Sequence, residues 1–117
     1  MENVNSTELI DIFMKNNISQ AFIIIGANWC PTCSMLKSAF ENSTIKIPEN
    51  IKSYDCTITQ DDADEHSDFN FFYKLKTGNE SIMNLPVLIF IKDNNWETSG
   101  FIPISMLQEK LNSYWMK

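Results

Sequence analysis

Two cysteines three residues apart, Cys30 and Cys33, are the residues of this 117-residue chain best suited to chemistry. Such a pair can cycle between a dithiol and a disulfide; the attacking species is the thiolate, so a redox cysteine needs surroundings that lower its pKa from about 8.5. Pro31 follows Cys30 and suits the first turn of a helix, because its missing N–H is not needed there. We therefore expect Cys30 at a helix N-terminus, where the dipole favours a thiolate, and Cys33 deeper and less exposed.

This asymmetry predicts a different role for each thiol. Cys30 is expected to attack a disulfide and form a mixed disulfide with the client, and Cys33 to attack Cys30 and release the reduced client. Trp29, which precedes the pair, is expected to belong to a flat apolar docking surface beside it.

The other residues that could do chemistry have weaker patterns. A zinc site built on Cys30 and Cys33 would have only Cys56 and His66 as further ligands, with a spacing unlike common zinc modules, and three cysteines exclude a four-cysteine iron-sulfur cluster. We expect Cys56 to be a buried structural residue, with a regulatory or dimer-forming thiol as the alternative, and His66 to be solvated. We expect the acidic residues around His66 to form a solvated helix start, since they lack the pattern of a calcium loop. No metal and no bound cofactor are expected.

Composition limits the class of protein. A chain of 117 residues that is 44% hydrophobic is expected to form one domain, residues 1–117, and to act as a monomer. The net charge is −6 without any arginine, which argues against a nucleic-acid partner. No apolar run approaches the length that spans a bilayer, and residues 1–17 lack the features of a leader. We expect a cytoplasmic protein; a periplasmic or secreted one is the alternative if a leader has been removed.

The elements that must position the cysteines alternate between helix and strand. Before the pair, apolar spacing predicts a helix over 6–16, with Asn5 and Glu8 as a capping box, and an unbroken apolar run predicts a central strand over 21–25. After the pair, a helix is expected from Pro31, with an apolar stripe of Met35, Leu36, Ala39 and Phe40, followed by a strand over 51–56. The next helix is expected to begin in the acidic residues of 61–68 and to continue through Phe69, Phe72 and Tyr73. A hairpin of strands 87–91 and 96–101 follows, and then a helix after Pro103 that buries Ile104, Leu107, Leu111 and Tyr114. Trp115 is expected to anchor that last helix, and Phe71 to join the neighbouring aromatic residues in the core unless it lines a docking groove.

Residues 27–33, Ala-Asn-Trp-Cys-Pro-Thr-Cys after an apolar strand, resemble the active-site signature of the thioredoxin family, and residues 82–87 resemble its cis-proline loop. The resemblance covers nearly all of the chain and is weakest over 57–81. It implies an α/β thioredoxin-like fold, a mixed central sheet of about four strands flanked by helices. It also implies a cis Pro86 beside Cys30 and a Leu85 backbone that pairs with the client. Pro31, Thr32 and Pro86 are expected to contact the client together with Trp29 and Leu85, and Pro31 and Thr32 also to tune the thiolate.

Two departures from that family bear on the mechanism. Ile24 occupies the position of the buried aspartate that helps to move the proton of the resolving thiol, and Ser53 is the nearest equivalent of its lysine partner. Deprotonation of Cys33 must then use water or another group. The two residues between the cysteines, Pro31 and Thr32, differ from those of thioredoxins, glutaredoxins and strong periplasmic oxidants. The sequence therefore allows a reduction potential anywhere between about −270 and −180 mV.

The sequence thus predicts a thiol-disulfide oxidoreductase that reduces protein disulfides, with electrons from an upstream donor such as a thioredoxin reductase or a dithiol. An oxidase or isomerase in an exported compartment is one alternative. The other is a non-catalytic thioredoxin-like binding or adaptor domain.

Overall fold

The structure is a computed structural model and describes residues 1–82 and 84–116. Its elements, in chain order, are β1 (Glu2–Asn5), α1 (Ser6–Lys15), β2 (Ala21–Ala27), α2 (Pro31–Glu41), β3 (Lys52–Ile58), α3 (Gln60–Ala63), α4 (Asp68–Thr77), β4 (Val87–Lys92), β5 (Asn95–Ser99) and α5 (Ile104–Ser113).

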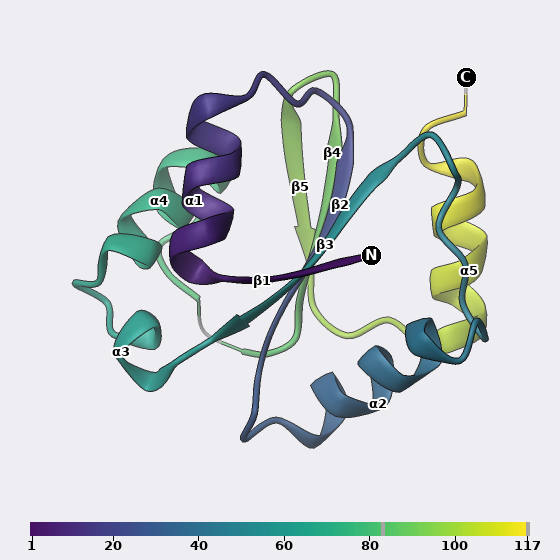
Figure 1. The fold of residues 1–117 in the computed structure, drawn as a ribbon, viewed down its shortest axis with the longest axis horizontal. Helices are drawn as coiled ribbons and strands as arrows, with labels where there is room; N and C mark the ends of the chain where they lie inside the picture. The colour runs from purple at the N-terminus through teal and green to yellow at the C-terminus, as the bar shows by residue number, and fades with distance from the viewer. Residues whose placement is uncertain (83, 117) are drawn as a thin grey trace.

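The strands form a five-stranded mixed sheet with helices on both faces (Figure 1). The strand order is β1-β3-β2-β4-β5; β1, β3 and β2 run parallel, whereas β4 is antiparallel to both β2 and β5. Helices α1 and α4 cover one face, and α2 and α5 cover the other. This is the predicted α/β architecture.

The central position of β2 explains its unbroken apolar sequence. All seven of its residues are buried. Ile23 and Ile25 pack in the core under α1 and α4, whereas Phe22 and Ile24 pack in the core under α2 and α5. A strand that is covered on both faces needs apolar residues at every position, because each side chain points into one of the two cores.

Local signals at the helix ends account for two further predictions. The Asn5 side chain accepts the N–H of Glu8 and the Glu8 side chain accepts that of Asn5, so the capping box before α1 is confirmed. The Trp115 Nε1–H donates to the Ile91 carbonyl at 2.8 Å, and the Trp115 ring packs against Phe90. Trp115 therefore anchors the C-terminal end of the chain to β4, as expected.

Several expected boundaries were wrong. The sheet has a fifth strand, β1, which was not predicted because four residues have no distinctive pattern of their own and this strand is defined by pairing with β3. The acidic stretch does not begin one continuous helix. Thr59 caps α3 and Ser67 caps α4, because hydroxyl side chains that accept backbone N–H groups define two separate helix starts.

Some apolar residues lie outside the core. Met35 is exposed on α2 rather than part of its buried stripe. Phe71 is 70% exposed on α4 and lines a separate groove beside α1, which is the alternative given for it rather than the core position. Phe101 lies beyond the end of β5 and is also exposed. Within the described residues, no helix is long and apolar enough to cross a membrane.

Candidate functional site

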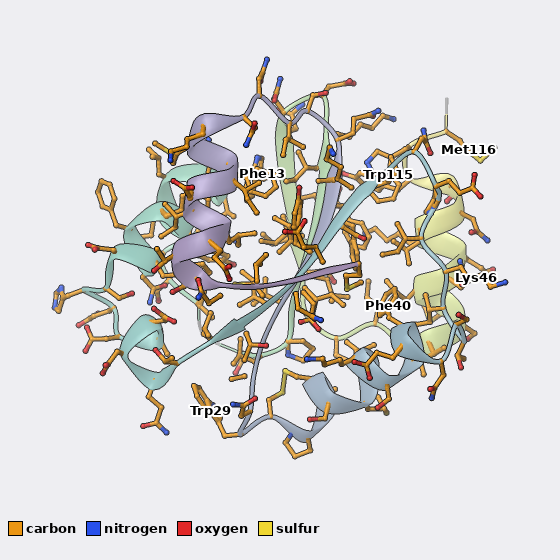
Figure 2. The ribbon with its side chains drawn as sticks, viewed as in Figure 1. Phe13, Trp29, Phe40, Lys46, Trp115 and Met116 are labelled. Atoms are coloured by element: carbon orange, nitrogen blue, oxygen red, sulfur yellow. A yellow bond between two sulfur atoms is a disulfide. The ribbon has the colours of Figure 1, made fainter. Side chains whose placement is uncertain are left out.

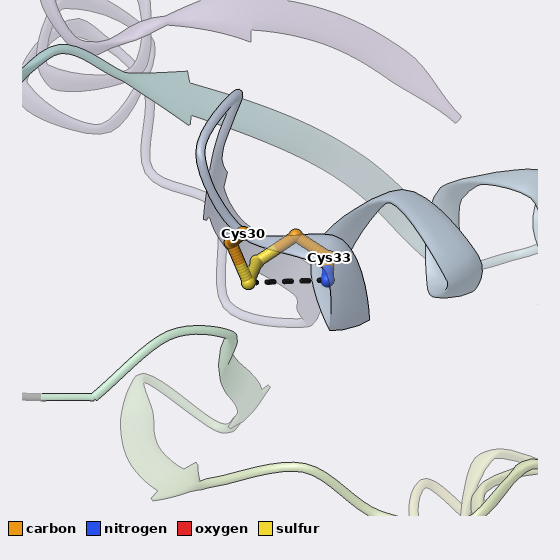
Figure 3. Close-up of a disulfide and its surroundings, with 2 residues drawn as sticks. All are labelled: Cys30 and Cys33. Atoms are coloured by element: carbon orange, nitrogen blue, oxygen red, sulfur yellow. Dashed lines mark hydrogen bonds between the residues drawn. A yellow bond between two sulfur atoms is a disulfide. The ribbon is translucent and has the colours of Figure 1, made fainter.

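Cys30 and Cys33 form a disulfide at the start of α2, directly beyond the end of β2 (Figure 3). Their Cα atoms are 5.2 Å apart. Cys30 is the N-cap residue of α2, Pro31 occupies the first helical turn, and the Cys33 N–H donates to the Cys30 Sγ at 3.2 Å. The Cys30 sulfur therefore lies where the unpaired N–H groups and the positive end of the helix dipole are concentrated, as the sequence predicted.

Cys33 packs directly on β2. A Cβ atom added to Gly26 would lie 3.0 Å from the Cys33 Cβ and 3.1 Å from its Sγ. Gly26 is thus the residue that lets the first turn of α2 approach the strand so closely, because a larger side chain would collide with it. No special conformation is needed at this glycine; only space is needed.

Cys30 borders an open groove of about 270 Å³. The other residues that line it are Trp29, Ile58, Ala63, Ile82, Asn84 and Leu85, which come from four separate segments of the chain. Trp29 is 48% exposed and lies in the loop between β2 and α2, at the lower edge of the molecule in Figure 2. The groove is mostly apolar and has a disulfide sulfur in its wall, so it can receive an extended apolar segment and expose that segment to a thiol.

The two cysteines differ less in burial than predicted. Cys30 is 8% exposed and Cys33 is 7% exposed, so Cys33 is not clearly the less accessible residue. What distinguishes them is their surroundings. Cys30 is among the residues that line the groove, whereas Cys33 is not and packs on Gly26.

The chain segment before β4 forms the opposite wall of the groove. The Leu85–Pro86 peptide bond is cis, Pro86 is buried, and Leu85 is half-buried against the α1/α4 core. Met83, in the middle of the loop over 82–87, lies outside the described residues. Leu85 and Trp29 both line the groove beside Cys30, as the resemblance implied.

A single buried side chain, Asn70, joins two of the groove's walls. Its Nδ2 donates to the carbonyls of Asp62, Ala63 and Asp64 at 3.3, 3.2 and 2.7 Å, and its Oδ1 accepts the Ile82 N–H at 3.0 Å. Ala63 and Ile82 both line the groove. Because Asn70 is fully buried in α4, these bonds hold the α3 wall and the loop wall to one rigid helix.

A buried carboxylate lies on the same face of the sheet as Cys33. Asp55 is level with Ile24 in the register of β3 with β2, and Lys37 Nζ lies 3.8 Å from its carboxylate. Burial, partly opposed by Lys37, raises the Asp55 pKa above its ordinary value. The residue beside Ile24 is therefore Asp55 and not Ser53, which pairs with Phe22.

Solved structures similar to this chain are thioredoxins. The thioredoxin of Fasciola hepatica superposes with a TM-score of 0.61 at 18% identity, over 96% of this chain and 97% of that one. Thioredoxin O2 of Arabidopsis thaliana, in its oxidised state, gives 0.64 at 18% identity over 97% and 95%, and a mutant thioredoxin of Halobacterium salinarum gives 0.58 at 21% over 99% and 93%.

The chain has the thioredoxin fold. No protein-family model matches it, and no curated protein matches it in sequence. The similarity in structure establishes the fold, whereas the sequence identities are too low to establish a function.

Within this thioredoxin fold, the predicted site residues are only partly brought together. Cys30, Trp29 and Leu85 line one groove. Pro31 is exposed and Thr32 half-buried at the start of α2, and neither lines the groove, nor does the buried Pro86. Sequence reasoning missed the other groove residues, which are Ile58, Ala63, Ile82 and Asn84. Asn84 adjoins Leu85 in the chain and could have been included; the others become neighbours only through the fold.

The remaining reactive residues lie apart from the groove. Cys56 is a fully buried free thiol in β3, and burial, with smaller contributions from Asp62, Asp55 and Glu8, raises its pKa to about 12. His66 is exposed, 3.5 Å from the Glu65 carboxylate. Among the described residues, no three His, Cys, Asp or Glu side chains cluster as metal ligands.

Proposed function

We propose that this protein is a thiol-disulfide oxidoreductase that reduces protein disulfides through a cycle of Cys30 and Cys33. The observation that carries the proposal is the Cys30–Cys33 disulfide, with one sulfur at a helix N-terminus in the wall of an apolar groove. Solved thioredoxins have the same fold as this chain, and this similarity supports the proposal.

The reaction follows from the positions of the two sulfurs. In the reduced protein, the Cys30 thiolate, stabilised by the helix N-terminus, attacks a client disulfide; one client sulfur leaves as a thiolate and a mixed disulfide forms. The Cys33 thiolate then attacks the Cys30 Sγ, and the second client sulfur leaves. The client gains two electrons and two protons, and the protein becomes the Cys30–Cys33 disulfide. An upstream donor, such as a thioredoxin reductase or a dithiol, returns two electrons.

The groove provides the client site in this proposal. Trp29 and Leu85 would hold an apolar client segment against Cys30, and the backbone of Leu85, before the cis Pro86, would pair with that segment. Pro31 and Thr32 would set the stability of the thiolate, and no cofactor takes part. We further propose that residues 1–117 act as a single monomeric domain in the cytoplasm, without a nucleic-acid or membrane partner.

The test is the equilibrium reduction potential of the Cys30–Cys33 pair, measured in dithiothreitol and glutathione buffers by mass shift after thiol alkylation. A potential at or below about −250 mV supports a reductase, whereas one near −180 mV or above moves the assignment to an oxidase or isomerase in an exported compartment.

Turnover of a protein disulfide is measured in parallel. We expect Cys30→Ser to abolish turnover and Cys33→Ser to accumulate the mixed disulfide, while the control Cys56→Ala, which changes a cysteine away from the groove, keeps full activity. A double Cys30→Ser, Cys33→Ser variant that retains the biological role would instead identify a binding or adaptor domain.

A further inference from the structure

The second step of the proposed cycle requires a proton acceptor for Cys33. The thiol must lose its proton before its sulfur can attack Cys30, and Cys33 is only 7% exposed, packed against Gly26. Bulk water has limited access to it. A base positioned on the protein would therefore accelerate this step.

Asp55 is a carboxylate in a suitable place. Its neighbours in β3, Tyr54 and Cys56, point into the core under α1 and α4, so the alternation of the strand directs Asp55 to the opposite face, toward α2. Asp55 is 7% exposed. In the register with β2 it is level with Ile24, two residues from Gly26, on which Cys33 packs; two residues of strand correspond to about 7 Å.

Lys37 connects the carboxylate to the helix that carries Cys33. Cys33 and Lys37 are four residues apart in α2 and thus lie on one face of the helix, about 6 Å apart along its axis. The Lys37 Nζ lies 3.8 Å from the Asp55 carboxylate. Asp55 is therefore held beneath α2, about one helical turn behind Cys33.

The surroundings of Asp55 raise its pKa above the ordinary value of an aspartate. Burial raises its pKa most, Glu41 of α2 raises it further, and the attraction and hydrogen bond of Lys37 oppose both. Its neighbours across the sheet, Ile24 in β2 and Asn3 in β1, are uncharged. A carboxylate whose pKa is raised is a stronger base than an ordinary surface aspartate.

We propose that Asp55, positioned by Lys37, accepts the proton of Cys33 through a water molecule during resolution of the mixed disulfide. The Cys33 S–H bond breaks and the proton moves to Asp55; the Cys33 sulfur then bonds to the Cys30 sulfur and expels the client thiolate. The proton on Asp55 next passes to the client thiolate or to solvent, which restores the carboxylate. This inference rests on the proposed function, and it places the base on β3, beside the Ile24 position where the resembling family carries its aspartate.

The experiment follows the two chemical steps separately. Reduced protein is mixed with a peptide disulfide, the reaction is quenched in acid, and mass spectrometry records formation and decay of the Cys30 mixed disulfide from pH 5.5 to 9. For Asp55→Asn we expect formation within twofold of the unsubstituted protein and decay about a hundredfold slower at pH 7, with the deficit closing as hydroxide takes over at high pH. Asp55→Glu should restore most of the decay rate.

Two further variants keep the inference testable. Lys37→Gln removes the charge that lowers the Asp55 pKa, so the pH midpoint of the decay rate should move upward. This variant tests the role of Asp55 even if Asp55→Asn does not fold. Asp93→Asn, the same change at an exposed turn, should alter neither step. Decay of Asp55→Asn within twofold at every pH, or an unmoved midpoint in Lys37→Gln, would overturn the role of Asp55. Absence of any mixed disulfide on Cys30 would instead overturn the proposed function.

Discussion

Cys33 lies so close to Gly26 that a methyl group at residue 26 would require Cys33 to move by a few tenths of an ångström. The added Cβ would lie 3.0 Å from the Cys33 Cβ, closer than ordinary van der Waals contact between carbon atoms. The contact joins the central strand to the helix that carries both active-site cysteines, so any displacement of one is transmitted to the other.

Gly26→Ala should therefore destabilise the protein by about 1 to 3 kcal/mol, the range for overpacking in a well-packed interior. Urea unfolding of the oxidised protein measures this effect. Gly100→Ala is the matched control, because among the described residues no heavy atom beyond its chain neighbours lies within 4 Å of the corresponding Cβ position. Equal midpoints for the two variants would show that α2 moves away from β2 without cost.

Trp29→Ala should lower kcat/KM for a protein disulfide by about tenfold, which corresponds to about 1.4 kcal/mol of lost contact with the client. The indole is half-exposed in the groove wall and is thus free to cover a bound segment. Reduction of a small-molecule disulfide, which does not fill the groove, should change by less than twofold. Phe71→Ala removes another exposed aromatic side chain that does not line this groove, and should leave both rates unaltered.

Asn70→Ala should destabilise the fold by about 2 to 3 kcal/mol, because it leaves the buried Ile82 N–H without its acceptor and removes the Asn70 hydrogen bond to the Asp64 carbonyl. The loop that contains Ile82 should lose more stability than the rest of the fold. Hydrogen exchange at the Ile82 amide should therefore accelerate more than hydrogen exchange in β2. Asn112→Ala, at an exposed position of α5, is the control. Unchanged exchange at Ile82 would show that Asn70 does not hold the loop.

Cys56 should remain unreactive in the native protein. Its thiol is fully buried and its pKa is raised to about 12, so iodoacetamide at pH 8 should leave Cys56 unlabelled in the reduced native protein and label all three cysteines in denaturant. Labelling of all three without denaturant would contradict this burial.

The same thiol predicts alkaline destabilisation. Between its unfolded pKa of 9.0 and about 12 the folded state holds a proton that the unfolded state has lost, so the free energy of unfolding falls as pH rises through this window. The stability contributed by the neutral thiol is fully present below pH 9. Cys56→Ala should therefore show a shallower decline between pH 9 and 12 in urea titrations. Parallel declines would show that other groups cause it.

Features encoded over a few residues were predicted well. The capping box at Asn5 and Glu8, the buried run of β2 and the helix start at Pro31 depend on neighbours within one turn or on simple periodicity. The placement of Cys30 at a helix N-terminus follows from the same local signals. By contrast, the four-residue β1 was missed, and so were the separate starts of α3 and α4, because the first depends on pairing with β3 and the second on caps inside an acidic stretch.

The sequence by itself determined that this chain carries a cysteine pair at a helix start after a buried central strand, since capping, periodicity and spacing act between near neighbours. Only the tertiary structure decided which residues surround that pair. The groove brings Ile58, Ala63 and Ile82 to Cys30 from later parts of the chain, and Asp55 faces α2 because of one particular register between β3 and β2. A shift of a single residue in that register would have turned the carboxylate to the other core, and no local pattern in the chain specifies such a pairing.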